Sequence, residues 1–182
     1  MILGDGIRLR GPEKDDIPRF TEWLNDPEVR QGLLIYLPMA NWQEEKWFES
    51  LSDRPLDEVP LTIEIETPGE GWVPIGNIGI MDIEWRHRSG EVGLFIGEKR
   101  FWGQGYGRRV MALFLDHAFD TLNLNRFFLR VYDNNERAKR SYLSVGFIEE
   151  GRLRAAIYQD GVYFDVVMMS VLKSEWQERR SR

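Results

Sequence analysis

The chain has 182 residues, of which 42% are hydrophobic and 30% are charged, and its net charge is −6 at pH 7. The negative charge disfavours general nucleic-acid binding but suits a cationic small substrate. No apolar run reaches the length of a membrane span, and the absence of cysteine excludes disulfides, thiolate metal sites and a cysteine nucleophile. One domain is expected. No signal peptide is visible, and together with the absence of cysteine this favours a cytoplasmic location. No metal is expected, because the two histidines form no ligand pattern, and neither a nucleic-acid nor a membrane partner is expected.

The first third of the chain predicts one strand followed by two helices. Residues 7–11 alternate between apolar and charged side chains, as a half-buried strand does. Residues 12–26 have helical periodicity despite Pro18, and a second helix is expected to begin near Asn41, a plausible cap. The apolar residues expected on these two helices are Phe20, Trp23, Leu24, Trp42, Trp47, Phe48 and Leu51.

The rest of the chain predicts an alternation of strands and helices. Strands are expected at 61–67, 73–85, 90–97, 126–132, 147–153 and 163–172, with a hairpin turn at "YQDG" between the last two. A helix follows the third of these strands, a second helix covers 134–145 and closes at Gly146, and a short helix precedes the C-terminus. This order predicts an α/β (α+β) fold with a mixed, mostly antiparallel sheet of about seven strands.

The stretch "RFWGQGYGRRV", residues 100–110, follows a predicted strand and opens a predicted helix. A helix N-terminus offers free amides and positive potential, and glycines allow an anion to approach them. Because Arg108 and Arg109 add charge, the stretch predicts a phosphate site, with a glycine-rich turn and solvated arginines as the alternative. It is neither a Walker loop nor a dinucleotide fingerprint, whose last glycine is replaced by Arg108 or Val110.

A second motif follows downstream. Residues 135–147, "NERAKRSYLSVGF", read N-x-x-A-x-x-x-Y-x-x-x-G-F, and residues 100–105 read R-x-x-G-x-G. With both motifs in this order, the chain resembles the GNAT superfamily of acetyl-coenzyme A-dependent N-acetyltransferases. Its two ends are similar to the branch of ribosomal-protein-alanine and spermidine acetyltransferases. The resemblance implies one acetyltransferase domain over residues 1–182, with a sheet that splays to hold coenzyme A and is flanked by helices.

The resemblance also implies roles for particular residues. Phe95 and Ile96 match the strand end whose backbone pairs with the pantetheine arm. Asn135 matches a pantetheine ligand, Lys139 lies where a cation meets phosphates, and Tyr142 matches the residue beside the thioester sulfur. The loop that holds the pyrophosphate matches Arg100, Gly103, Gln104, Gly105, Tyr106, Gly107 and Arg108.

Acetyl transfer to an amine requires a base for the ammonium and a donor for the leaving thiolate. Glu91 is the candidate base, directly or through water, with Asp82 and Glu84 as alternatives. Tyr142 is the candidate donor, and its alternative role is that of a core aromatic residue. Without cysteine, direct transfer in a ternary complex is favoured over an acyl-enzyme.

The acceptor is expected to be a cationic primary amine, either polyamine-like or a protein N-terminus, because several carboxylates are expected to rim its cleft. The alternative to an enzyme is a non-catalytic sensor that binds acyl-coenzyme A. The sequence leaves open whether the chain forms a homodimer. The rim candidates are Glu64, Glu66, Asp82, Glu84 and Glu91.

Overall fold

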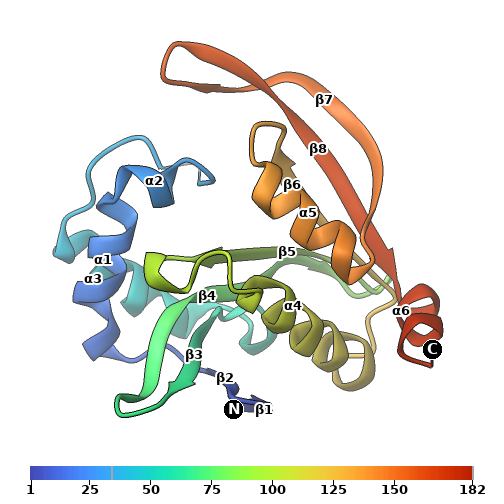
Figure 1. The fold of residues 1–182 in the computed structure, drawn as a ribbon, viewed down its shortest axis with the longest axis horizontal. Coiled ribbons are helices and arrows are strands. Elements are labelled where there is room, and N and C mark those ends of the chain that lie inside the picture. Colours follow the sequence, from blue (N-terminus) through green and yellow to red (C-terminus); the bar gives the residue numbers. More distant parts are fainter. Residues whose placement is uncertain (34, 182) are drawn as a thin grey trace. The chain divides into compact units, whose positions relative to one another are not determined.

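The computed structural model describes residues 1–33 and 35–181, and it contains a mixed sheet of 8 strands in the order β1-β2-β3-β4-β5-β6-β8-β7 (Figure 1). Two compact units are found, residues 1–80 with 93–113 and residues 81–92 with 114–182. The strands are β1 (Ile2–Gly4), β2 (Ile7–Arg10), β3 (Leu61–Thr67), β4 (Gly71–Glu84), β5 (Ser89–Ile96), β6 (Arg126–Tyr132), β7 (Ile148–Gln159) and β8 (Val162–Leu172). The α-helices are α1 (Ile17–Asn25), α2 (Pro27–Arg30), α3 (Asn41–Ser50), α4 (Tyr106–Asp116), α5 (Glu136–Val145) and α6 (Lys173–Arg180).

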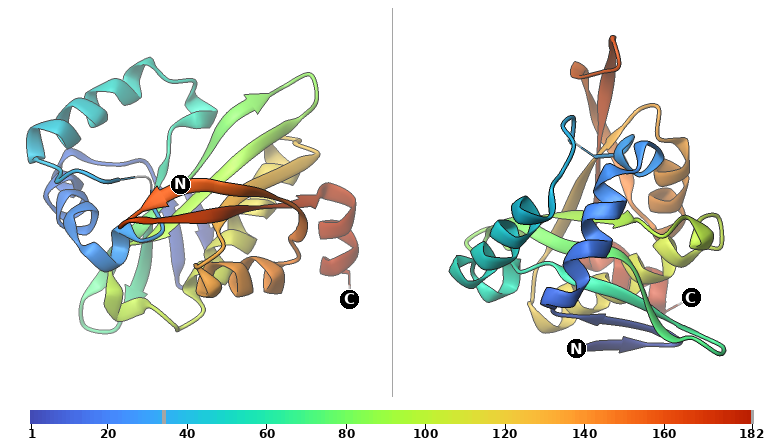
Figure 2. Two further views of the ribbon diagram at one scale, coloured as in Figure 1. Left: turned by 90° about the horizontal axis from the view of Figure 1, so that it is seen from above. Right: turned by 90° about the vertical axis from the view of Figure 1, so that its left-hand side faces the viewer.

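The first unit contains the antiparallel strands β1 to β3 and most of β4. Ile7 and Leu9 of β2 and Ile63 and Ile65 of β3 are fully buried on one face, as the alternation of apolar residues predicts. Helices α1 and α3 pack against each other (Figure 2). Their contact is aromatic, because Phe20 of α1 meets Trp47 of α3 edge-on at 6.0 Å between ring centroids. This unit therefore has its own core.

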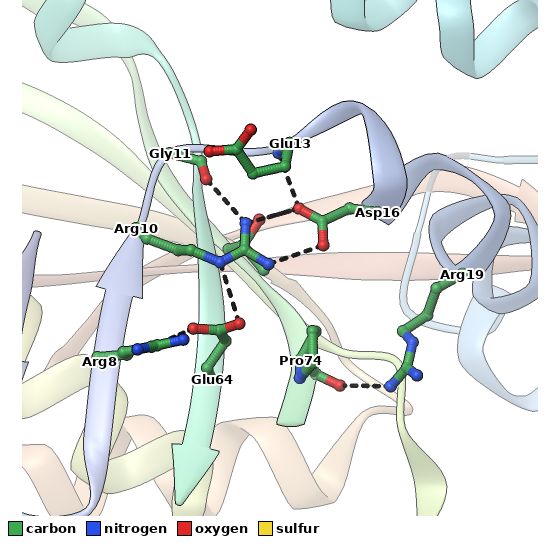
Figure 3. Close-up of polar contacts among 9 residues, drawn as sticks. Arg8, Arg10, Gly11, Glu13, Asp16, Arg19, Glu64 and Pro74 are labelled. Carbon is green, nitrogen blue, oxygen red and sulfur yellow. Dashed lines mark hydrogen bonds and ion pairs between the residues drawn. The ribbon is translucent and has the colours of Figure 1, made fainter. Parts of the chain in front are cut away.

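The other face of β2 and β3 carries a network of buried charges (Figure 3). The two terminal nitrogens of Arg10 donate to Asp16 at 2.7 and 2.8 Å, and its Nε lies 3.0 Å from Glu64. Arg8 donates to the same Glu64 carboxylate, and Thr62 donates to Asp16 at 3.3 Å. The network ties the start of α1 to both strands.

This network corrects one expectation from the sequence. Glu64 was expected among the carboxylates that rim an acceptor cleft, but its side chain is buried and paired with two arginines. The alternating pattern of β3 places Glu64 on the same face as Thr62, and that face is covered rather than open. Glu66, two residues further along, is exposed.

The second unit is arranged around β6. Ser89–Glu91 of β5 pair in parallel with Arg126–Phe128, and the whole of β6 pairs antiparallel with β8. Within this unit, the described part of β6 therefore continues for residues 129–132 after its pairing with β5 has ended. β7 and β8 form a long hairpin that turns at Asp160 and Gly161, both with positive φ (Figure 1).

The predicted class, a mixed and mostly antiparallel α/β sheet, is confirmed, and the predicted strands at 61–67 and 126–132 match β3 and β6. The sheet has one strand more than the seven that the sequence located, because the three-residue β1 folds back on β2 and is too short for its alternation to stand out. Pro18 is tolerated because it lies in the first turn of α1, where its missing N–H has no intrahelical partner.

Two details of the second helix also differ from expectation. Helix α3 is capped at Ala40 rather than Asn41, because the Gln43 side chain accepts the Ala40 N–H at 2.9 Å. Trp42 is 57% exposed, with the Lys46 ammonium 4.9 Å from its ring. In the part of the chain that the structure describes, no helix is long and apolar enough to cross a membrane. The cytoplasmic location and the single domain stay predictions.

Candidate active site

The glycine stretch forms an open turn that leads into α4. Gly103 and Gly105 have φ angles of +74° and +80°, a conformation that side chains with a Cβ rarely adopt. Both residues are exposed, and no other group lies within 4 Å of a Cβ built on either. Helix α4 begins at Tyr106, so its first amides have no intrahelical acceptor. Free amides at a helix N-terminus, next to an open turn of this kind, are groups that can bind an anion.

The arginines around this turn differ in how they are partnered. Arg100 donates both terminal nitrogens to Glu70, each at 2.8 Å. Arg109 donates to the backbone carbonyl of Asp5 at 2.5 Å and lies 3.8 Å from its carboxylate. Arg108 is exposed, and it makes no ion pair with residues 1–33 or 35–181. Among the three arginines, Arg108 therefore has a guanidinium that could pair with a bound anion without first breaking an ion pair to the described residues.

The remaining positions of the stretch have structural contacts of their own. Gln104 donates to the carbonyl of Arg100 at 2.5 Å, which tightens the turn. The Tyr106 ring meets Phe101 edge-on at 5.5 Å between centroids. Gly107 follows within the first turn of α4 and is half-buried. These contacts fix the turn without using the exposed amides of Gly103 and Gly105.

Phe95 and Ile96 end β5. The Phe95 side chain is half-buried and meets Trp23 edge-on at 6.3 Å between centroids. The carbonyl of Ile96 accepts the indole N–H of Trp102 at 2.8 Å. The Phe95 side chain and the Ile96 carbonyl therefore serve the packing of the first unit, and any contact of these two residues with the pantetheine arm would use their other backbone groups.

Glu91 lies in the part of β5 that belongs to the second unit. It is 6% exposed, and its two oxygens accept from Arg130 Nε at 2.7 Å and Nη2 at 2.8 Å. Hydrogen bonding to Glu91 raises the pKa of Arg130. A two-point pair of this kind holds both side chains in a fixed orientation. Glu91 is thus a buried, oriented carboxylate, and Arg130 is a neighbour that the sequence did not single out.

The second motif forms α5 and the turn before it. The side-chain oxygen Oδ1 of Asn135 caps the helix by accepting the Ala138 N–H at 3.1 Å. The side-chain NH2 group of Asn135 is left for other partners. The Lys139 ammonium lies 2.7 Å from Glu136 and 3.0 Å from Asp133. Hydrogen bonds to these two carboxylates raise the pKa of Lys139. The positive charge of Lys139 is therefore already balanced by two carboxylates of its own unit.

Tyr142 lies on the inner side of α5. Its ring is 5.8 Å from Phe147 between centroids, and the side chain is only partly accessible. Burial raises the pKa of Tyr142 to about 12, because the phenolate would be poorly solvated. The phenol therefore stays protonated throughout the physiological pH range. It can donate a hydrogen bond, as the proposed role requires.

The comparisons with known proteins agree with these motifs. The family model described as "Acetyltransferase (GNAT) domain" matches residues 7–148. The chain belongs to the GNAT acetyltransferase family. The spermidine N(1)-acetyltransferase of Vibrio cholerae is 34% identical over 178 residues, which cover 97% of this chain and 99% of that protein. A putative ribosomal N-acetyltransferase of Bacillus subtilis, YdaF, is 32% identical over 102 residues, 56% of this chain and 55% of that one.

Solved structures show the same fold in other GNAT acetyltransferases. The crystal structure of the Vibrio cholerae spermidine N-acetyltransferase in complex with CoA and spermine has a TM-score of 0.83 and 25% identity, and the match covers 96% of this chain and 99% of that one. The GNAT chain described here is accordingly an N-acetyltransferase that uses acetyl-CoA. The open glycine turn and the unpaired Arg108 fit a cosubstrate that carries phosphates.

One candidate functional residue of this acetyltransferase, Glu44, was not singled out from the sequence. Glu44 in α3 is 4% exposed, and its carboxylate has no ion pair or hydrogen bond with residues 1–33 or 35–181. Burial raises its pKa. A signal was present, because Glu44 lies on the helical row of Trp47, Phe48 and Leu51, where an apolar residue is the norm.

Proposed function

We propose that this GNAT acetyltransferase transfers an acetyl group directly from acetyl-CoA to a primary amine of a cationic, polyamine-like acceptor. The observation that supports the proposal most is the open turn at Gly103 and Gly105, beside the unpaired Arg108. Its exposed amides can bind the pyrophosphate without any rearrangement of the backbone. The other residues proposed to bind the cosubstrate are Phe95, Ile96, Arg100, Gln104, Tyr106, Gly107, Asn135, Lys139 and Tyr142.

The proton of the attacking ammonium is proposed to leave through water to Glu91. Arg130 occupies one lone pair on each oxygen of Glu91, and a carboxylate has about four such sites, so a water can still donate to it. Direct contact with the amine is disfavoured by the 6% exposure of Glu91. The neutral amine nitrogen then attacks the thioester carbon, the tetrahedral intermediate loses its second N–H proton to water, and the bond from that carbon to sulfur breaks.

Tyr142 is proposed to stabilise the departing thiolate by a hydrogen bond. With a phenol pKa of about 12 against ~8.5 for a free thiol, complete proton transfer would be uphill by about 5 kcal/mol. A donated hydrogen bond has no such cost and still lowers the energy of the developing charge. The sulfur then takes its final proton from solvent.

A cationic acceptor is supported by the relatives and by Glu44. The named relatives include spermidine acetyltransferases, whose substrate carries several ammonium groups. In this chain, Glu44 lies on α3, the second of the early helices. In the branch of ribosomal-protein-alanine and spermidine acetyltransferases that the chain resembles, the early helices cover the acceptor site. A buried carboxylate that has no partner among residues 1–33 and 35–181 gains a charge-assisted hydrogen bond when a cation arrives. We therefore propose that Glu44 binds an ammonium group of the acceptor.

The variant Gly105→Asp tests the phosphate site. The carboxylate would stand beside the pyrophosphate, so we expect the Kd for coenzyme A to rise at least about tenfold. The matched control is Gly105→Asn, which has the same shape without the charge and tolerates a positive φ. Calorimetry with coenzyme A measures both variants. Equal affinity of the folded aspartate variant and the parent protein would refute the loop assignment.

The variant Glu44→Gln tests the acceptor assignment. Replacing the carboxylate by an amide removes the charge-assisted bond, so we expect the KM for spermidine to rise about tenfold with little change in kcat. Steady-state assays of thiol release measure both constants. The neighbouring Glu45→Gln is the control, because Glu45 is exposed on the same helix. An unchanged KM, or an acidic amine that competes as well as spermidine, would contradict the cationic acceptor.

A further inference from the structure

Two hairpin turns of the first unit each bring a carboxylate to an arginine beside the glycine turn. The turn between β1 and β2 places Asp5 next to Arg109. The turn between β3 and β4 places Glu70 on Arg100. Of the two carboxylates, Glu70 lies closer to its arginine, because both terminal nitrogens of Arg100 meet both of its oxygens at 2.8 Å, whereas the Asp5 carboxylate lies 3.8 Å from Arg109.

The position of Glu70 is set by its turn. Glu70 stands between Gly69 and Gly71, whose φ angles are +80° and +75°, and its N–H donates to the Thr67 carbonyl at 3.1 Å. The backbone path through these two glycines sets the direction in which the side chain of the residue between them points. The sequence "PGEG" therefore presents a carboxylate at the tip of this hairpin, where it meets Arg100.

The Glu70 carboxylate has the geometry that a phosphate would have on Arg100. A guanidinium binds both groups through the same two-point arrangement. Hydrogen bonding to Arg100 lowers the pKa of Glu70, so the carboxylate is ionised at neutral pH. The pair is easily opened, because the two side chains are 46% and 49% exposed and exposed ion pairs are weak. A phosphate that carries more charge than a carboxylate would displace it.

We propose that Glu70 is an internal competitor for Arg100, which it holds until a phosphate group of the cosubstrate displaces it. The inference rests on the proposed function, since it takes the glycine turn to be the phosphate site. Its consequence is that the chain binds coenzyme A less tightly than its arginines would allow. Weaker binding of the product in turn favours its release.

The variant Glu70→Gln tests this competition by the affinity for coenzyme A at low ionic strength. Freeing Arg100 should lower the Kd about two- to fivefold, the range expected for an exposed pair. The control is Glu66→Gln, which removes the same charge from an exposed position on β3. Its Kd should stay at the parent value. A Glu70→Gln variant that binds no more tightly than the parent would overturn the proposal, since Glu70 would then only orient Arg100.

A double variant separates competition at Arg100 from a general change in charge. If Glu70 acts through Arg100, the gain from Glu70→Gln disappears in an Arg100→Gln background. A gain that persists there overturns the proposal. The Gly105→Asp variant tells this failure apart from failure of the proposed function. If Gly105→Asp still weakens binding, the phosphate site stands and only the competitor is wrong, whereas an unaffected Gly105→Asp removes the site itself.

Discussion

Replacing Tyr142 by phenylalanine should lower kcat about 100-fold and leave the affinity for coenzyme A nearly unchanged. The variant keeps the ring that packs against Phe147 and removes only the hydroxyl. Loss of one positioned donor in a protected site has an effect of this size. Because the affected interaction forms only as the sulfur becomes charged, kcat and kcat/KM should fall together.

The measurement is the rate of thiol release with a saturating amine, together with calorimetry for coenzyme A. Phe147→Leu is the matched control, because it disturbs the packing of the same ring without removing the hydroxyl. A Tyr142→Phe variant with the full rate would return Tyr142 to the role of a core residue. Since burial raises the pKa of the phenol to about 12, its ionisation should not limit the rate below about pH 10.

Replacing Asp16 by asparagine should destabilise the protein by about 3 kcal/mol, because it leaves Arg10 in a covered site with Glu64 as its remaining carboxylate partner. Urea denaturation of the parent and the variant measures the difference. The neighbouring Asp15→Asn is the control, since Asp15 is exposed, and it should change stability by less than about 0.5 kcal/mol.

The same pair predicts a pH dependence. Burial by itself would raise the pKa of Asp16, but the hydrogen bonds from Arg10 and the Glu13 backbone outweigh it, so the pKa is lowered. A lowered pKa in the folded state contributes stability above the unfolded value of about 3.8, and this stability is lost as the pH falls through the folded value. The Asp16→Asn variant should therefore lose less stability than the parent between pH 5 and about pH 3. Parallel acid curves would show that Asp16 does not contribute in this way.

The strands were predictable wherever alternation or a long apolar run was strong. Residues 61–67 alternate over seven positions, and β3 has those bounds. The turn at the glycine stretch and the helix within the Asn135–Phe147 motif could also be predicted from the sequence, because a turn of positive φ and a capped helix depend on local residues. From these two motifs the family followed, and the comparisons confirmed it.

The partners of the charged side chains were decided by the tertiary structure alone. Glu64 and Glu91 have the same exposed-looking pattern in the sequence as Glu66, yet the first two are buried against arginines from other strands. Arg100 and Arg108 are equally charged in the sequence, and only the fold brings Glu70 to Arg100 and leaves Arg108 without an ion pair to the residues that the structure describes. Local order along the chain determines turns, caps and strand faces, because these depend on neighbouring residues. The pairing of charges depends on contacts between distant segments, and such contacts exist only in the folded chain.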